Sequence, residues 1–242
     1  MTENNFKDGV AMLPQTRIQW IDVAKLIGIY LVILGHINMT YNELIVFIFS
    51  FHMPLFFFLS GLTAKKESVI VSFTKSVKSI LLPYACMYLI HYIKRIATIM
   101  YKPERFEDGF LKPFLGLFVG VGYDTEYSVM ACVPLWFLTG LFCCKMLFSL
   151  IHYIFSDKNE NIVQIIISVL FAVSAYLLKS NHLFLPFSLG SAFMAYPFFA
   201  IGNIFSPKIN SVLKNDSNYT TKKTFGGCDD YRTNINNRFV VY

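Results

Sequence analysis

Six runs of apolar residues, each close to the length of a membrane-spanning helix, dominate this chain of 242 residues. The hydrocarbon core of a bilayer takes about 20 apolar residues of α-helix, because each residue advances the helix by about 1.5 Å. Backbone polar groups inside lipid need hydrogen-bond partners within the protein, and a helix supplies them. The sequence therefore predicts an all-α polytopic transmembrane helix bundle. We expect its spans at 20–40, 45–63, 79–99, 133–154, 162–178 and 184–205.

The composition favours the lipid bilayer as the partner of this chain and argues against nucleic acid. Hydrophobic residues make up 55% of the chain and charged residues 15%, whereas soluble domains average about 25% charged residues. The formal net charge of +6 is spread along the chain. Neither a basic helix nor alternating aromatic and basic side chains gathers it into a nucleic-acid groove.

The positions of Lys and Arg predict the orientation. Residues 1–25 contain three of them and residues 64–78 contain four, whereas the turn at 41–44 contains none. Because Lys and Arg are retained on the cytoplasmic side, we expect a cytoplasmic N-terminus in a bacterial inner membrane. The parity of the spans then places 102–132 outside. That segment holds an apolar stretch too short to span, which predicts a re-entrant or interfacial helix.

Three segments follow one another along the chain. A polar N-terminal segment covers 1–17, the membrane domain covers 18–205, and a polar, Asn-rich tail covers 206–242. The tail has no helical periodicity and cannot bury enough apolar surface to offset the entropy of ordering it. We therefore expect a disordered tail, and its abrupt beginning is typical of a truncated or frame-shifted reading frame.

Ionisable residues inside a span are costly and mark candidate functional sites. The first span contains Asp22, Lys25 and His36. At 100° per residue, the three fall on one face of a helix, with about 16 Å along the axis between Lys25 and His36. Asp22 and Lys25 are three residues apart and can pair with each other. An interfacial position for these two, with Lys25 snorkelling to the headgroups, is the alternative.

The second span adds His52 at a depth close to that of His36. Two adjacent antiparallel helices could bring both imidazoles to one site, where a neutral ring can take a proton from an alcohol. Metal binding is the rival interpretation, but no third ligand of a suitable type lies nearby, so no metal is expected. For His91 and His152 we expect hydrogen bonds between helices instead.

Glycine and proline in these spans indicate how the helices pack. Gly35 and Gly61 are expected to let neighbouring helices approach closely. Pro54 is expected to kink the second span.

Three sequence patterns resemble one membrane-protein family. They are WIDVAKLIGIYLVILGH at 20–36, SFHMPLFFFLSG at 50–61 and PLWFLTGLF at 134–142. Together they resemble the membrane-bound acyltransferase-3 family, most closely its fucose 4-O-acetylase-like branch. The resemblance implies transfer of an acyl group, usually acetyl from cytoplasmic acetyl-CoA, to a sugar hydroxyl across the membrane. Acyl-CoA would be the donor substrate and a glycan or another hydroxyl compound the acceptor, with no bound cofactor.

The resemblance also assigns roles to residues. The family's motif of a basic residue and a histidine separated by ten positions falls on Lys25 and His36. The family's basic pair before the third span falls on Lys75 and Lys78, which would hold the phosphates of CoA. His36, with His52, would take the acceptor's proton or relay the acyl group.

Lys25, held by Asp22, would orient the donor or stabilise negative charge on the thioester. We attribute Lys65 and Lys66 to the general enrichment of positively charged residues on the cytoplasmic side of a membrane.

Two other functions compete with an acyltransferase. A transporter or flippase would use Asp22, Lys25 and His36 as a proton or substrate pathway. Transporters tend to show inverted repeats, and none is found in this sequence. A non-catalytic remnant of the family is the second rival, suggested by the polar sequence that begins at Ser206 where family members continue with further spans.

Overall fold

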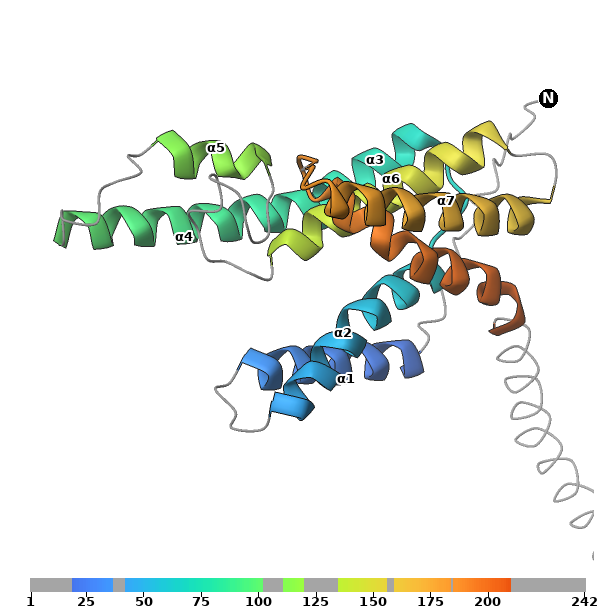
Figure 1. Ribbon diagram of the computed structural model, residues 1–242, viewed down its shortest axis with the longest axis horizontal. Helices are drawn as coiled ribbons and strands as arrows, with labels where there is room; N and C mark the ends of the chain where they lie inside the picture. The colour runs from blue at the N-terminus through green and yellow to red at the C-terminus, as the bar shows by residue number, and fades with distance from the viewer. Residues whose placement is uncertain are drawn as a thin grey trace, which may run out of the picture. The chain divides into compact units, whose positions relative to one another are not determined.

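The computed structural model describes residues 19–36, 42–101, 111–119, 135–155, 159–183 and 185–209, and these are helical apart from short turns, with no strand among them (Figure 1). The predicted all-α class is confirmed. The helices are α1 (Gln19–His36), α2 (Asn42–Leu62), α3 (Val69–Ser76), η1 (Val77–Leu81), α4 (Leu82–Tyr101), α5 (Leu111–Val119), α6 (Leu135–Ile154) and α7 (Glu160–Ser180). A further helix, Leu189–Ile209, ends the described part of the chain.

Five of the described helices are long and apolar enough to cross a membrane. They cover Ile45–Leu62, Val69–Thr98, Leu135–Ile154, Glu160–Ser180 and Leu189–Ile209. They correspond to the second through sixth predicted spans, and the final helix continues four residues beyond the expected boundary at 205. The first predicted span coincides with α1, which is not among the five. The tail from 210 onward lies outside the described residues.

The third span is longer than the sequence suggested. We expected 79–99, but α3, η1 and α4 form one continuous helix from Val69 to Tyr101. A π-turn joins its two α-helical parts, and the backbone N–H of Leu82 donates to the carbonyl of Val77, five residues earlier. Pro83 explains this turn, because proline lacks an N–H and clashes with the carbonyl four residues before it. Wider winding at η1 therefore lets the helix pass the proline without ending.

The distribution of exposed side chains is the inverse of that in a soluble protein. On α7, Ile165, Val169 and Leu177 are more than half exposed, whereas Gln164 and Ser168 are buried. Soluble monomers rarely expose such continuous apolar surface. Lipid tails cover apolar faces without cost, and polar groups turn inward to find partners. The chain is an integral membrane protein.

The chain divides into two compact units, Met1–His52 and Met53–Tyr242, with the boundary inside α2. In the first unit, α1 meets the first half of α2 close to Gly35. A Cβ atom added to Gly35 would lie 3.1 Å from a methyl carbon of Ile48 and 3.5 Å from the ring of Phe49. This is tight contact, so the predicted packing role of Gly35 is confirmed.

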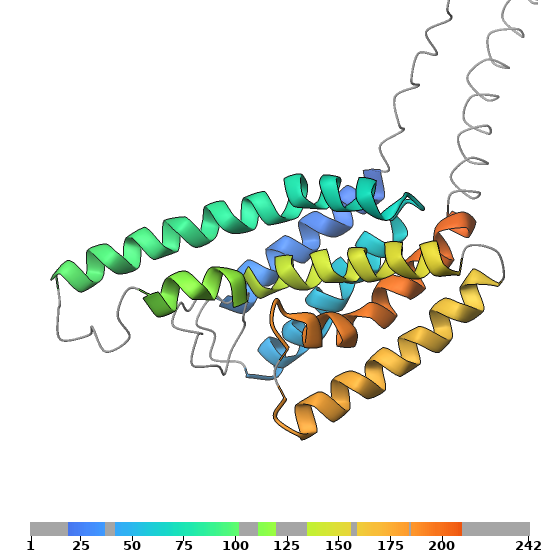
Figure 2. The same ribbon diagram turned by 90° about the horizontal axis from the view of Figure 1, so that it is seen from above.

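In the second unit, α6, α7 and the helix Leu189–Ile209 alternate in direction (Figure 2). The second half of α2 crosses the last of these helices with its backbone in contact. A Cβ on Gly61 would lie 1.9 Å from the carbonyl oxygen of Phe199, and one on Gly202 would lie 2.1 Å from that of Phe58. Only glycine fits at either position, which confirms the expectation for Gly61.

Two polar side chains reinforce this crossing. The Asn203 side-chain amide donates to the carbonyl of Gly61 at 3.4 Å, and the Gln164 amide donates to Asn203 Oδ1 at 3.2 Å. All three groups are buried, so α2, α7 and the last helix are held at one depth by polar contacts. Aromatic side chains fill the rest of the core, which includes Phe57, Phe148, Tyr196 and Phe199.

The short helix α5 lies along α4 (Figure 1). It has nine residues, about 13 Å at 1.5 Å per residue, which is far less than a bilayer core. The hydroxyl of Tyr84 on α4 donates to the carbonyl of Leu117 at 2.9 Å. The predicted non-spanning helix in this region therefore exists, and it is attached to α4.

Candidate functional site

A pocket lies where the loop after α2 meets α3 and α6. Its volume is about 220 Å³, below the roughly 300–1,000 Å³ of pockets that enclose drug-sized ligands. Three lysines line it, namely Lys65 in the loop, Lys75 on α3 and Lys145 on α6. The pocket is therefore suited to the charged end of a ligand rather than to a whole cofactor-sized molecule.

Local structure explains why these lysines converge. After Leu62 the chain turns at Thr63, and the backbone N–H of Ala64 donates to Gly61 O at 3.1 Å, which directs the loop toward α3. α3 and η1 pack directly on α6. This packing brings Lys75 and Lys145, seventy residues apart in the sequence, to the same hollow.

Hydroxyl groups complete the lining. Ser76 on α3 and Ser149 on α6 are almost fully buried, and Thr63 and Ser72 also face the pocket. Ammonium and hydroxyl groups together are donors suited to the oxygens of a phosphate, and lysine serves there as a point charge. The hollow thus has the chemistry of an anion site.

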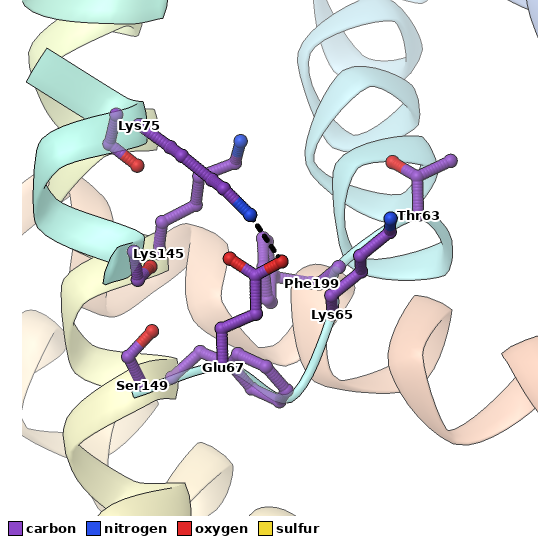
Figure 3. Close-up of a pocket in the computed structure, with 11 residues that line it drawn as sticks. Thr63, Lys65, Glu67, Lys75, Lys145, Ser149 and Phe199 are labelled. Carbon is purple, nitrogen blue, oxygen red and sulfur yellow. Dashed lines mark hydrogen bonds and ion pairs between the residues drawn. The ribbon is translucent and has the colours of Figure 1, made fainter. Parts of the chain in front are cut away.

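One carboxylate lies among the lysines. Figure 3 shows Thr63 and Lys65 on one side, and Lys75, Lys145 and Ser149 on the other, with Glu67 between the two groups. Lys75 Nζ lies 2.6 Å from Glu67 Oε1, with the Lys75 side chain 63% exposed and that of Glu67 23% exposed. An ion pair occupies the centre of the site.

Of the two lysines assigned to CoA by resemblance, the structure brings only Lys75 to this pocket. Lys78 lies in η1, is exposed, and is not among the residues that line the hollow. Lys65, which we had attributed to cytoplasmic positive charge alone, lines it. Lys145 was not among the predicted site residues. It could have been found from the sequence, because it is an ionisable residue within the apolar sequence FCCKMLF, as Asp22 is within the first span.

A second charged cluster lies beside the pocket and has a different composition. Lys66 Nζ donates to Glu160 Oε2, and His152 Nδ1 donates to Glu160 Oε1 at 2.7 Å. The cluster connects the loop after α2 with the end of α6 and the start of α7. The predicted interhelical hydrogen bond of His152 is confirmed, and Lys66 has a specific partner.

The two charged residues near the start of α1 lie on its less exposed side. Asp22 and Lys25 are half-buried, whereas Leu26, Tyr30 and Ile33 are more than half exposed. We predicted that His36 shares a helical face with Asp22 and Lys25. The side chain of His36 lies outside the described residues, and the structure describes only its helical backbone.

His52 is fully buried, and its ring is oriented by α2 itself. Nδ1 lies 2.5 Å from the carbonyl oxygen of Ile48, which can only accept, so Nδ1 carries the proton. In the neutral ring, Nε2 then has its lone pair available. Nε2 is buried without a hydrogen-bond partner among the described residues. His52 is therefore held in the tautomer that a general base requires.

No group of three or more His, Cys, Asp or Glu able to hold a metal ion occurs in the described part of the chain. The fold and the site define a class of protein, an integral membrane helix protein with a pocket lined by lysine and hydroxyl side chains. One family model, the acyltransferase domain, matches residues 18–223. The chain belongs to that acyltransferase family and is a membrane acyltransferase. No curated protein and no solved structure gives a significant match to it.

Proposed function

We propose that this protein is an O-acyltransferase that moves an acyl group, most simply acetyl, from acyl-CoA to a hydroxyl of a sugar or glycan. The observation that carries the donor assignment is the pocket of Lys65, Lys75 and Lys145 with its buried serine hydroxyls. CoA carries a diphosphate and a phosphomonoester, and three convergent ammonium groups can neutralise much of that charge. By the predicted orientation the pocket opens to the cytoplasm, where acyl-CoA is found.

The transfer requires a base for the acceptor. In the proposed reaction the acceptor oxygen attacks the thioester carbonyl, a histidine takes the hydroxyl proton, and the thiolate of CoA leaves. We assign this proton transfer, or a relay of the acyl group, to His36 together with His52. The support for His52 is its tautomer, because Nδ1 is bound to Ile48 O and Nε2 has no partner among the described residues. Lys25 and Asp22 would orient the donor or stabilise charge on the thioester.

The acceptor lies on the opposite side of the membrane in this proposal. The expected place of the protein is the bacterial inner membrane, with its N-terminus in the cytoplasm, and its reaction is O-acetylation of a polysaccharide or a similar glycan. The fucose 4-O-acetylase-like branch of the family, favoured by the residues at 20–36 and 50–61, supports a sugar acceptor.

Membranes containing the protein should be incubated with acetyl-CoA labelled in the acetyl group, together with a mixture of glycan acceptors. Label transferred to the glycan supports the proposal. Glycan movement without label transfer would establish a transporter or flippase instead, and neither activity would establish a non-catalytic remnant.

The donor pocket can be tested in the same assay. Lys145→Ala should raise the KM for acetyl-CoA about tenfold or more, since hydrogen bonds to charged groups contribute about 1.5–3 kcal/mol and Lys145 is half-buried. Lys75→Ala should raise it by up to about fivefold, because the Lys75 side chain is 63% exposed and an exposed ion pair contributes about 0–1 kcal/mol. Lys179→Ala is the matched control, an exposed lysine in the last turn of α7 that does not line the pocket. Equal KM values in all three variants would contradict the assignment of the donor phosphates to this pocket.

A further inference from the structure

Glu67 has an unusual place in this site. It is the one acidic residue among the described residues that line the pocket, where it faces three lysines. Its carboxylate is 2.6 Å from the ammonium of Lys75. The oxygens of a bound phosphate would need the same space. A site built only to bind an anion would have no reason to hold a carboxylate there.

A purely structural role would be to fasten the loop to α3. The loop is already held at its two ends and attached to α7. Ala64 N–H donates to Gly61 O at 3.1 Å where α2 ends, Ser72 N–H donates to Ser68 O at 2.9 Å in the first turn of α3, and Lys66 pairs with Glu160. An exposed ion pair adds only about 0–1 kcal/mol, and Lys75 is 63% exposed. Loop attachment therefore does not require Glu67.

We propose that Glu67 is a displaceable internal anion that occupies the phosphate position until the donor binds. This inference rests on the proposed function, since the displacing anion is the phosphate end of acyl-CoA. In the exchange, the contact between Lys75 Nζ and Glu67 Oε1 breaks, a contact between Nζ and a phosphate oxygen forms, and the Glu67 carboxylate turns to solvent. No covalent bond changes.

Such an exchange selects the ligand by its charge. The three lysines and one glutamate leave a formal excess of two positive charges around the pocket. A ligand with one negative charge replaces Glu67 one for one and gains little, whereas a diphosphate or a phosphomonoester dianion gains a second attraction. Glu67 thus sets a threshold that favours highly charged donors over the singly charged anions of the cytoplasm.

The magnitude follows from Coulomb's law. Once displaced, the carboxylate repels mainly the nearest ligand charge, at about 6 Å, and at an effective dielectric constant of about 40 for a partly exposed site this single repulsion reduces the binding constant about tenfold, because more distant charges are screened by solvent. Removal of the Glu67 charge should therefore tighten the binding of a polyanion by about tenfold at low ionic strength. The gain should shrink as salt is added.

The test uses the full chain in nanodiscs and measures equilibrium binding of two ligands, CoA and inorganic pyrophosphate. Glu67→Gln should tighten both by about tenfold, and Glu67→Ala, which removes the same charge, should act alike. Glu160→Gln is the matched control, because Glu160 also pairs with a lysine of the same loop but does not line this pocket. Its affinities should stay within twofold of the unmodified protein.

The outcomes separate this inference from the proposed function. Tighter binding of pyrophosphate by Glu67→Gln, with no CoA binding by any variant, would support the displaceable anion and overturn CoA as the donor. CoA binding that needs Lys75 but is unchanged or weaker in Glu67→Gln would overturn the inference and leave the proposed function intact. Absence of binding of either ligand, in the unmodified protein and in Glu67→Gln, would overturn both.

Discussion

Replacement of Gly61 by alanine should destabilise the second unit more than any other single-methyl change along α2. The helices touch backbone to backbone at this position, and the added Cβ would lie 1.9 Å from the carbonyl oxygen of Phe199. A carbon and a carbonyl oxygen in close contact are about 3.3–3.6 Å apart. The two helices must therefore separate by more than about 1 Å, judged against that contact distance.

The cost can be estimated from the contacts that would be lost. Insertion of a methyl group into a packed interface costs about 1–3 kcal/mol. The separation would also break the hydrogen bond from the Asn203 amide to Gly61 O, which is already 3.4 Å long, and such interhelical bonds contribute about 0.6 kcal/mol. We expect the free energy of unfolding to fall by about 2–3 kcal/mol, since the two contributions share one interface.

The measurement is reversible unfolding in mixed micelles of increasing denaturing detergent, followed by circular dichroism. Gly190→Ala is the matched control, because it lies on the same helix as Phe199 and a Cβ there has no neighbour within 4 Å. That substitution should be neutral or slightly stabilising, by up to about 1 kcal/mol, since alanine favours a helix more than glycine does. Equal stability of the Gly61 and Gly190 variants would refute the close backbone contact.

Three further outcomes are expected. His36→Ala should reduce the rate of acyl transfer by about 10²–10⁴, as loss of a positioned acid–base group does. The control His91→Ala should have a mild effect, because an interhelical hydrogen bond contributes about 0.6 kcal/mol. Similar mild effects of the two substitutions would leave His36 without a catalytic role. A reporter fused after Lys66 should be cytoplasmic, and one within 102–132 extracytoplasmic, whereas a cytoplasmic reporter in 102–132 would contradict the predicted third span. Deletion of 210–242 should leave the amount of membrane-inserted protein unchanged on immunoblots, and a large fall would show that the tail is packed against the bundle.

Much of the fold follows from local sequence properties. The apolar runs specify helices because lipid leaves the backbone no other partners, and their approximate bounds follow from the thickness of the bilayer. Gly35 and Gly61 could be assigned to helix contacts, since a residue without Cβ inside a span is most useful where backbones meet. The π-turn at η1 was also within reach of the sequence, because Pro83 inside an apolar run requires some local change of winding.

The site was less predictable because its residues meet only through packing. Helical periodicity assigns Lys75 to a face of its own helix, but it does not say which other helix covers that face. Lys145 and Glu67 reach Lys75 through the contact of α3 with α6 and through the turn after Gly61. The family resemblance pairs Lys75 with Lys78, whereas the structure places only Lys75 in the hollow.

The link between Lys66 and Glu160 joins residues 94 positions apart, and this separation has a consequence for synthesis of the chain. At about 5–20 residues per second, Glu160 is made roughly 5–20 s after Lys66. During that interval the helices Val69–Thr98 and Leu135–Ile154 enter the bilayer. If one of them failed to cross, Glu160 would be left on the opposite side from Lys66. The ion pair therefore cannot form in a chain in which one of these two helices has failed to cross, and it distinguishes such a misinserted chain from a correctly threaded one.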